Sequence, residues 1–197
     1  MSELHSLIVL GSGEASAHQP GLFDAKIRAT VRYADPAAWI TATAVSLALT
    51  GFEDLLAEWR HQIGIIAVSD QGPGKSMESV QTAATTGFSS PLHYAASSPG
   101  TLVGVSCIAF GLRGPTLNLT MDPQDGLPVA INLCSAWLAR KVAPFMIVTT
   151  CRAGSSGAML SRAALLAPAG FSGSDAPLTE SLMTWLAAVD PVNGVEA

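Results

Sequence analysis

The segment Leu119–Pro128, with the sequence LTMDPQDGLP, has the pattern of a strand that turns directly into a helix. Elbows of this kind often present a nucleophile, because the free N–H groups at a helix N-terminus stabilise negative charge. The bend of this elbow carries Asp122, Pro123, Gln124 and Asp125. None of these is a Ser, Cys or Thr that could attack an acyl group. The spacing therefore predicts the scaffold of a covalent-catalysis site without its reactive group.

The residues of the bend favour a capped helix start instead of a reactive one. Proline has a fixed φ that suits a first helical turn, and the carboxylate of Asp122 or Asp125 can accept hydrogen bonds from the exposed N–H groups. We expect Asp125 to be the N-cap and Pro128 to lie in the first turn, because a proline deeper in the helix loses a hydrogen bond. A carboxylate here also disfavours a negatively charged intermediate, so no catalysis is expected at this elbow.

Two glycine-containing segments have incomplete phosphate-binding patterns. Ser69–Ser76, SDQGPGKS, ends in Gly-Lys-Ser like a P-loop, but Ser69 stands where that pattern requires glycine. Gly11–Gly13 imitates the start of a dinucleotide fingerprint, but no helix of suitable length follows before Pro20. We interpret Ser69–Ser76 as a turn capped by Ser76, and we expect no nucleotide or other cofactor.

The cysteines and histidines offer a weaker candidate site. Cys107, Cys134 and Cys151 are widely spaced in apolar sequence, which argues against a disulfide framework or a zinc site and predicts buried thiols. Only Cys151, beside Arg152, has the charged neighbour that an activated thiol needs. His93 lies in a segment that predicts a cleft loop, although a histidine held by backbone hydrogen bonds is the alternative. No metal site is predicted.

The composition narrows the class of protein. The chain has 197 residues, of which 49% are hydrophobic and 13% charged, against a usual charged share of about 25%. So few charged residues leave much of a monomer's surface apolar, which suggests that part of this surface belongs to a partner interface. The alternative is that the apolar residues form an unusually well-buried core. The net charge of −5 and the scattered basic residues argue against nucleic-acid binding. Only a short apolar run, Leu7–Leu10, follows Glu3 and His5, so we expect no signal peptide or membrane span and a cytoplasmic location.

Strand and helix patterns alternate along the chain, with turn residues between them. The predicted strands are Leu7–Leu10, Ile63–Val68, Thr116–Met121 and Phe145–Cys151. The predicted helices are Ala37–Thr50, Met77–Thr86, Pro99–Phe110, Leu127–Lys141 and Thr179–Val189. Phe52–Gln62 is expected to be an exposed helix or turn, Phe88–Ser98 a loop, and Ala153–Pro177 to contain a short strand or helix. The alternation predicts an α/β fold with a mixed or mostly parallel sheet and helices on both faces.

One motif carries a resemblance. Phe110–Pro115 reads FGLRGP and precedes the elbow strand, and the surrounding stretch Phe88–Thr150 resembles the β-ketoacyl synthase family, which has the thiolase fold. Counting forward from Gly114 without a gap, the family's Thr-Ala-Cys falls on Met121, Asp122 and Pro123, and its following glycine falls on Gly126. The resemblance thus implies that Pro123 stands at the position of the active-site cysteine.

The resemblance also implies that only half of the family's fold is present. Family enzymes consist of two related halves, and the second half carries the two catalytic histidines, or a histidine and an asparagine. Here the resemblance is strongest over residues 88–150, is weaker but consistent from Leu7 to Val68, and fades in the tail, 154–197. We expect residues 1–197 to form one such N-terminal domain, a layered mixed sheet with buried helices, and none of the family's catalytic triad can be placed.

Within the family, the chain is most similar to chain length factors. These lack the cysteine and pair with an active ketosynthase in polyketide and aryl-polyene pathways. Their substitute is a glutamine, whereas here Gln124 lies one place after Pro123, so a role for its amide is not implied. The resemblance implies that the strand Thr116–Met121 pairs with its counterpart across a dimer and that roughly Met77–Ala96 faces the partner's acyl tunnel. The side chains expected to contact substrate there are Met77, Gln81, His93 and Tyr94.

The sequence therefore predicts a catalytically inactive subunit that pairs with an active β-ketoacyl-ACP synthase in polyketide, aryl-polyene or fatty-acid-type biosynthesis and helps to bound the acyl tunnel. An acyl carrier protein is a second candidate partner. One alternative is an independent homodimer on the same scaffold that binds an acyl group or another small molecule. The other is a thioester-processing enzyme that uses Cys151 or His93.

Overall fold

The computed structural model describes residues 7–87, 90–154, 157–171 and 180–189. Five strands form one sheet in the order β1-β5-β4-β2-β3. Their bounds are β1 Leu7–Ala15, β2 Gly64–Val68, β3 Thr116–Leu119, β4 Met146–Ala153 and β5 Met159–Pro168. Strand β2 is parallel to β3 and β4, whereas β5 is antiparallel to β4 and β1. The predicted α/β class with a mixed sheet is confirmed.

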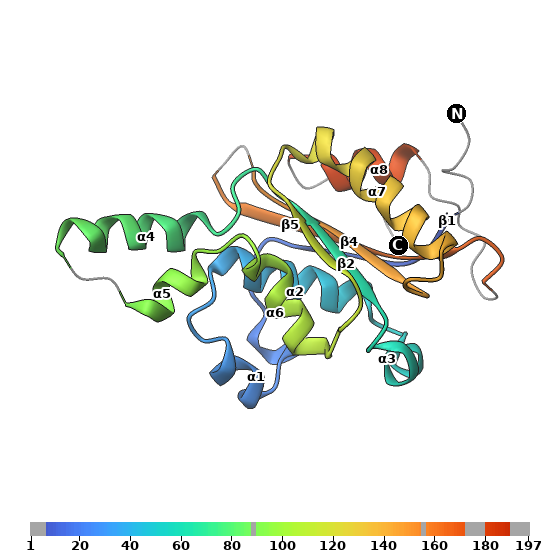
Figure 1. Cartoon of the computed structure of the whole chain (residues 1–197), viewed down its shortest axis with the longest axis horizontal. Coiled ribbons are helices and arrows are strands. Elements are labelled where there is room, and N and C mark those ends of the chain that lie inside the picture. The colour runs from blue at the N-terminus through green and yellow to red at the C-terminus, as the bar shows by residue number, and fades with distance from the viewer. Residues whose placement is uncertain (1–6, 88–89, 155–156, 172–179, 190–197) are drawn as a thin grey trace.

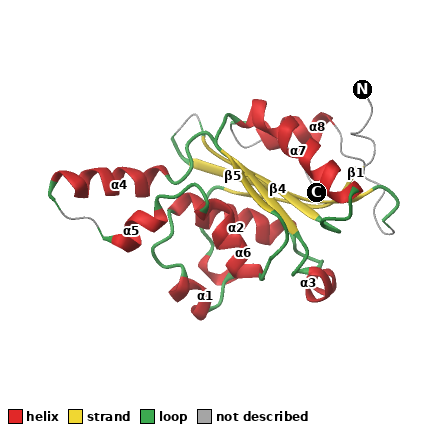
Figure 2. Cartoon of the chain, viewed as in Figure 1, coloured by secondary structure: helices red, strands yellow, loops and turns green. Residues whose placement is uncertain are grey.

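Helices cover both faces of the sheet (Figure 2). On one face lie α2 (Pro36–Ala48) and α6 (Thr101–Phe110), and on the other lie α7 (Pro123–Ala139) and α8 (Glu180–Ala187) (Figure 1). Strand β2 and most of β4 and β5 are buried, as expected of strands covered on both sides. Helix α2 is apolar nearly all round because it lies between α6 and the sheet.

Strand β1 is longer than the sequence predicted, since it continues through Gly11–Gly13 to Ala15. These glycines do not mark a turn. A Cβ atom on Gly13 would lie 2.3 Å from the carbonyl oxygen of Ala44 and 2.6 Å from the amide nitrogen of Ala48, both in α2. Glycine is therefore required because the backbone of α2 approaches the strand closely, and no nucleotide-binding loop forms here.

One further segment differs from the prediction, because the expected loop before α6 contains a helix, α5 (Pro91–Ala96). The strand or helix expected within Ala153–Pro177 is the ten-residue strand β5. The remaining helices are the 3-10 turn η2 (Pro20–Leu22), α1 (Ala25–Thr30), α3 (Glu53–Trp59) and α4 (Gly74–Thr85). Helix α8 lies within the predicted last helix, whose first residue, Thr179, is outside the described residues. No single helix in the described part of the chain could span a membrane by length and composition.

Helices α4 and α5 form an arm that projects from the body of the molecule (Figure 1). No residue of α4 is buried, and only Ala96 of α5 is. A twelve-residue helix without a buried face gains little stability from packing within its own chain.

Candidate functional site

The elbow lies between edge strand β3 and helix α7, and its backbone N–H groups are already bonded. The Asp122 Oδ1 atom accepts from the Gln124 N–H at 2.8 Å, and the Asp122 carbonyl accepts from Asp125 at 3.0 Å and Gly126 at 2.8 Å. Pro123, the first helical residue, is buried and has no N–H to donate. The donors that could stabilise an oxyanion at a helix start are therefore absent or already used in this first turn.

The predicted cap was wrong in detail. Asp122 is the N-cap, not Asp125, and Pro128 lies inside α7 instead of in its first turn. The helix begins earlier because Pro123 supplies a preformed first residue and the Asp122 side chain reaches the next N–H. Pro128 is exposed, so its missing hydrogen bond costs less than it would in a buried turn.

Gly126 fixes how closely α7 packs on the sheet. A Cβ atom at this position would lie 2.4 Å from Cγ1 of Val68 and 2.8 Å from Cγ of Met121. Val68 is fully buried at the end of β2 and is branched at Cβ, so it cannot easily move aside. The glycine that the resemblance placed after the nucleophile position is thus a packing requirement of the elbow.

The packing at Gly126 gives a test in which two similar substitutions have opposite effects. Gly126→Ala is expected to lower the free energy of unfolding by about 1–2 kcal/mol, because overpacking costs more than the gain in helix propensity. Gly104→Ala, in α6, is the control: its Cβ would meet nothing within 4 Å, so a gain of about 0.5–1 kcal/mol is expected. Urea denaturation measures both. Equal stabilisation would contradict the close packing of the elbow.

The elbow is joined to the C-terminal helix through Arg152, near the end of β4. Its NH2 group lies 3.4 Å from Oδ2 of Asp122, and its NH1 group donates to the carbonyl of Ala187 at 2.9 Å. The Arg152 side chain is 13% exposed and that of Asp122 is 40% exposed, so the ion pair is partly screened by solvent. The helix N-cap and the end of α8 therefore share one cation.

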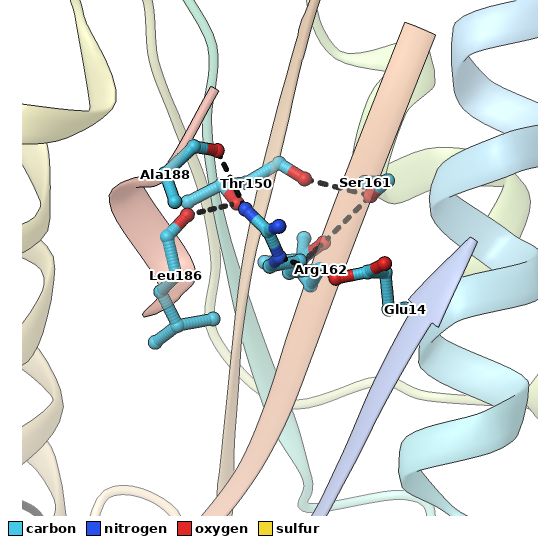
Figure 3. Close-up of polar contacts among 7 residues, drawn as sticks. Glu14, Thr150, Ser161, Arg162, Leu186 and Ala188 are labelled. Atoms are coloured by element: carbon cyan, nitrogen blue, oxygen red, sulfur yellow. Dashed lines mark hydrogen bonds and ion pairs between the residues drawn. The ribbon is translucent and has the colours of Figure 1, made fainter. Parts of the chain in front are cut away.

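A buried polar network lies next to this contact (Figure 3). Arg162 of β5 is 1% exposed. Its Nε donates to Glu14 of β1 at 2.7 Å, its NH1 donates to the carbonyl of Ala188 at 2.5 Å, and its guanidinium lies 5.4 Å from the ring centroid of Trp185. Thr150 donates to the carbonyl of Leu186 at 2.7 Å. With Arg152, these side chains bind three successive carbonyls at the end of α8, where cations are favoured.

The sequence analysis missed this network, although it contains a signal for it. Arg162 is the only charged residue in the otherwise largely apolar strand MLSRAALLAP. A charged side chain in a strand buried on both faces needs an ion-pair or hydrogen-bond partner, because an unpaired buried charge is costly. The identity of that partner, Glu14, follows only from the pairing of β5 with β1.

The side chains predicted to contact substrate do not lie at the elbow. Met77 and Gln81 are on α4, and His93 and Tyr94 are on α5, so all four belong to the arm and are exposed. His93 was expected in a cleft loop, but it lies on a helix, with its ring 5.7 Å from that of Tyr33. Substrate contact by these four residues remains a prediction.

The turn before the arm is also capped differently from the prediction. Asp35 is 1% exposed; its Oδ1 accepts from the Ala37 N–H of α2 at 2.8 Å, and its Oδ2 accepts from the Ser76 N–H of α4 at 2.7 Å. One carboxylate therefore caps two helices, and Ser76 is not the cap. The N-terminus of α4, where a P-loop would hold phosphate, carries a protein carboxylate instead.

The three thiols lie in apolar surroundings. Cys134 and Cys151 are buried as predicted, whereas Cys107 is half-buried. Burial raises the pKa of Cys134 to about 12 and that of Cys107 to about 11. Burial raises the pKa of Cys151 to about 12; the hydrogen bond with Thr41 opposes this shift in part, and the carboxylates of Asp35 and Asp70 add smaller upward shifts. These thiols are protonated near neutral pH, so the site does not favour a thiolate nucleophile.

The raised pKa values predict slow labelling of all three cysteines by iodoacetamide at pH 8 in the folded protein and fast labelling in urea. They also predict a pH effect on stability. Unfolded thiols lose their protons above about pH 9, while the folded thiols keep theirs until about pH 11. The unfolded state then binds fewer protons, so the thiol contribution lowers the free energy of unfolding as pH rises through this window. Rapid labelling of Cys151 in the folded protein would restore the thioester-processing alternative.

Comparison with known proteins identifies the fold. No protein-family model and no curated protein sequence matches the chain. Among solved structures, the ishigamide ketosynthase/chain length factor is similar with a TM-score of 0.65 and 13% identity, over 85% of this chain and 63% of that one. A β-ketoacyl synthase from Burkholderia phymatum gives 0.65 and 13%, over 83% of this chain and 59% of that one. This chain thus spans less than two thirds of these two proteins.

A third similar structure is more equal in length. A chain in the complex of the ketosynthase ApeO with its chain length factor ApeC, from Xenorhabdus doucetiae, matches with a TM-score of 0.59 and 13% identity. The match covers 92% of this chain and 90% of that chain. Identities this low establish the fold and leave the activity open. The chain therefore has a half of the thiolase-like fold that ketosynthases and chain length factors share, as the sequence predicted, with Pro123 as the first helical residue of its elbow.

Proposed function

We propose that this chain is a non-catalytic, ketosynthase-like subunit that pairs with an active β-ketoacyl synthase and helps to bound the cavity in which the partner's acyl chain grows. The observation that carries the proposal is the elbow: Pro123 stands at the position that the resemblance assigns to the nucleophile. The side chain and the carbonyl of Asp122 accept hydrogen bonds from the neighbouring N–H groups. A subunit that keeps this scaffold without its chemistry needs a catalytic partner.

The edge of the sheet supports pairing. Strand β3 bonds to β2 on one side only, so among the described residues its other edge has no strand beside it. A free strand edge presents a row of backbone N–H and C=O groups, and a strand of a partner added at this edge could pair with them. The proposed partner strand would lie at Thr116–Met121.

The arm supports a second contact region for the same partner. Tyr33, Leu92 and Ile108 are large apolar residues with 40%, 52% and 50% exposure. They line one groove of about 380 Å³ at the base of the arm, together with small residues of α5 and α6. Tyr94, at 69%, and Met77, at 52%, extend the exposed apolar surface along the arm. Such a patch is typical of an interface, and its place before α6 fits the proposed contact with an acyl tunnel.

The pairing is tested by light scattering of the purified full chain, alone and after co-expression with a ketosynthase from the same genome. A stable one-to-one complex is expected. Leu92→Glu with Tyr94→Glu should abolish it without changing the melting temperature, because both side chains are exposed. Val142→Glu is the control, since Val142 is 53% exposed but follows the far end of α7. A well-behaved homodimer that binds no ketosynthase would favour the independent binding protein instead.

Restoring the nucleophile gives a further prediction. Pro123→Cys in the isolated protein is expected to show no condensation of acyl and malonyl thioesters above background. The first-turn N–H groups are already bonded, and no histidine of the described chain adjoins the elbow in a hydrogen bond or ring contact. Thin-layer or mass-spectrometric product assays would detect turnover. Condensing activity from Pro123→Cys alone would contradict the non-catalytic role.

A further inference from the structure

A pocket of about 670 Å³ lies at the end of α7 opposite to the elbow. Its volume is in the range of small-molecule sites, about 300–1,000 Å³. Three aromatic side chains line it, Trp59, Phe145 and Phe171. The ring centroids of Phe145 and Phe171 lie 5.0 Å apart, and those of Trp59 and Phe145 lie 6.4 Å apart, both pairs in edge-to-face geometry. These rings hold one another in place, so the apolar wall is formed before any ligand binds.

The polar side chains that line this pocket can all donate hydrogen bonds. They are the ammonium group of Lys141, the amide of Gln62 and the indole N–H of Trp59. Lys141 is the only ionisable side chain among the described residues that line the pocket, and the protein as a whole has a net charge of −5. An apolar wall with one cation favours a ligand that has an apolar tail and a single negative charge.

The backbone of Lys141 is in an unusual conformation. Lys141 follows α7 with φ = 56°, and it is the only residue other than glycine with positive φ in the described chain; the others are Gly51, Gly72, Gly87, Gly111, Gly157 and Gly170. The bonds from Lys141 N–H to Leu138 and from Val142 N–H to Trp137 form the helix-ending motif in which glycine is the usual residue. Lysine here lowers stability, and strain of this kind concentrates at functional positions.

We propose that this pocket binds an amphipathic monocarboxylate, with its apolar tail against Trp59, Phe145 and Phe171 and its carboxylate at Lys141. Helix α7 has 17 residues, so its length of about 25 Å separates the pocket from the elbow. The pocket is therefore separate from the elbow, and the inference does not depend on the proposed function.

The experiment measures binding of decanoate to the full chain by isothermal titration calorimetry, with decanol as the uncharged control. Decanoate is expected to bind one to one and decanol about tenfold more weakly, because decanol lacks the charge-assisted bond. Lys141→Gly separates binding from stability: it should raise the melting temperature, since glycine suits this φ, and weaken decanoate binding about tenfold. Lys141→Arg should keep the binding.

Three results would overturn the inference: no binding of decanoate, equal binding of decanoate and decanol, or unchanged decanoate affinity in Lys141→Gly. Ala169→Trp gives an independent check, because Ala169 is an exposed residue lining the pocket and a larger side chain there should block the tail. Decanoate binding that survives Ala169→Trp unchanged would place the ligand elsewhere on the protein and contradict the site.

Discussion

Replacing Arg162 with alanine is expected to lower the free energy of unfolding by about 3–5 kcal/mol, since the change truncates a side chain that is 1% exposed and breaks its ion pair with the partly exposed Glu14. The change also leaves the Ala188 carbonyl without its bond from Arg162 and removes the cation that lies over the ring of Trp185. For a domain of this size the melting temperature should fall by roughly 8–15 °C. Calorimetry and urea denaturation measure the two quantities.

Two control variants make this prediction specific. Arg113→Ala removes an exposed arginine, and its effect should stay within about 0.5 kcal/mol. Arg162→Lys keeps the charge but should recover less than half of the loss, because Arg162 bonds to Glu14 and Ala188 through two different guanidinium nitrogens. If Arg162→Ala proves as mild as Arg113→Ala, the network does not hold α8 on the sheet.

The core elements could be predicted because their patterns are local. Helices α2 and α6 and strands β2 and β4 have apolar runs with turn residues at their ends, and these signals need no knowledge of the fold. The resemblance around Phe110–Pro115 then placed the elbow, and the thiolase-like fold was confirmed. The same resemblance placed Gly126, whose packing reason became clear only with the structure.

The errors arose where a distant segment decides the local conformation. Gly11–Gly13 looks like a strand end, yet the close backbone of α2 requires glycine within β1. The N-terminus of α4 looked like a turn capped by its own serine, yet the cap is Asp35, which is 41 residues away from Ser76. Glu14 and Arg162 are separated by 148 residues. Pairings over such distances depend on strand order, which hydrophobic periodicity does not encode.

The elbow and the arm differ in what stabilises them. At the elbow, Asp122 accepts hydrogen bonds from the first N–H groups of α7 and pairs with Arg152. These bonds stabilise the elbow, whereas a nucleophile at this place would need free N–H donors and often a strained backbone. In the arm, the chain leaves large apolar side chains exposed, which costs solubility unless a partner covers them. The first feature stabilises the fold by itself, and the second is accounted for by the proposed partner.

Asp35→Ala is expected to test how the arm is attached. The substitution removes the caps of α2 and α4 together and leaves two N–H groups without acceptors, so the free energy of unfolding should fall by about 2–3 kcal/mol. Hydrogen exchange should reveal a local effect as well. Amides of α4 are expected to exchange faster than the global loss of stability explains, because the hydrogen bond from the Ser76 N–H to the Asp35 side chain ties the start of the arm to the body.

The matched control for Asp35 is Asp24, an exposed residue whose carboxylate caps only α1. Its Oδ1 atom accepts a hydrogen bond from the Ile27 N–H at 2.7 Å. Asp24→Ala should cost about 0.5–1 kcal/mol and leave exchange in α4 unchanged. If the arm contacts a ketosynthase as proposed, Asp35→Ala should also weaken the complex at temperatures where both variants remain folded, whereas Asp24→Ala should not. Weaker pairing without faster exchange in α4 would mean that Asp35 acts through α2, and not through the orientation of the arm.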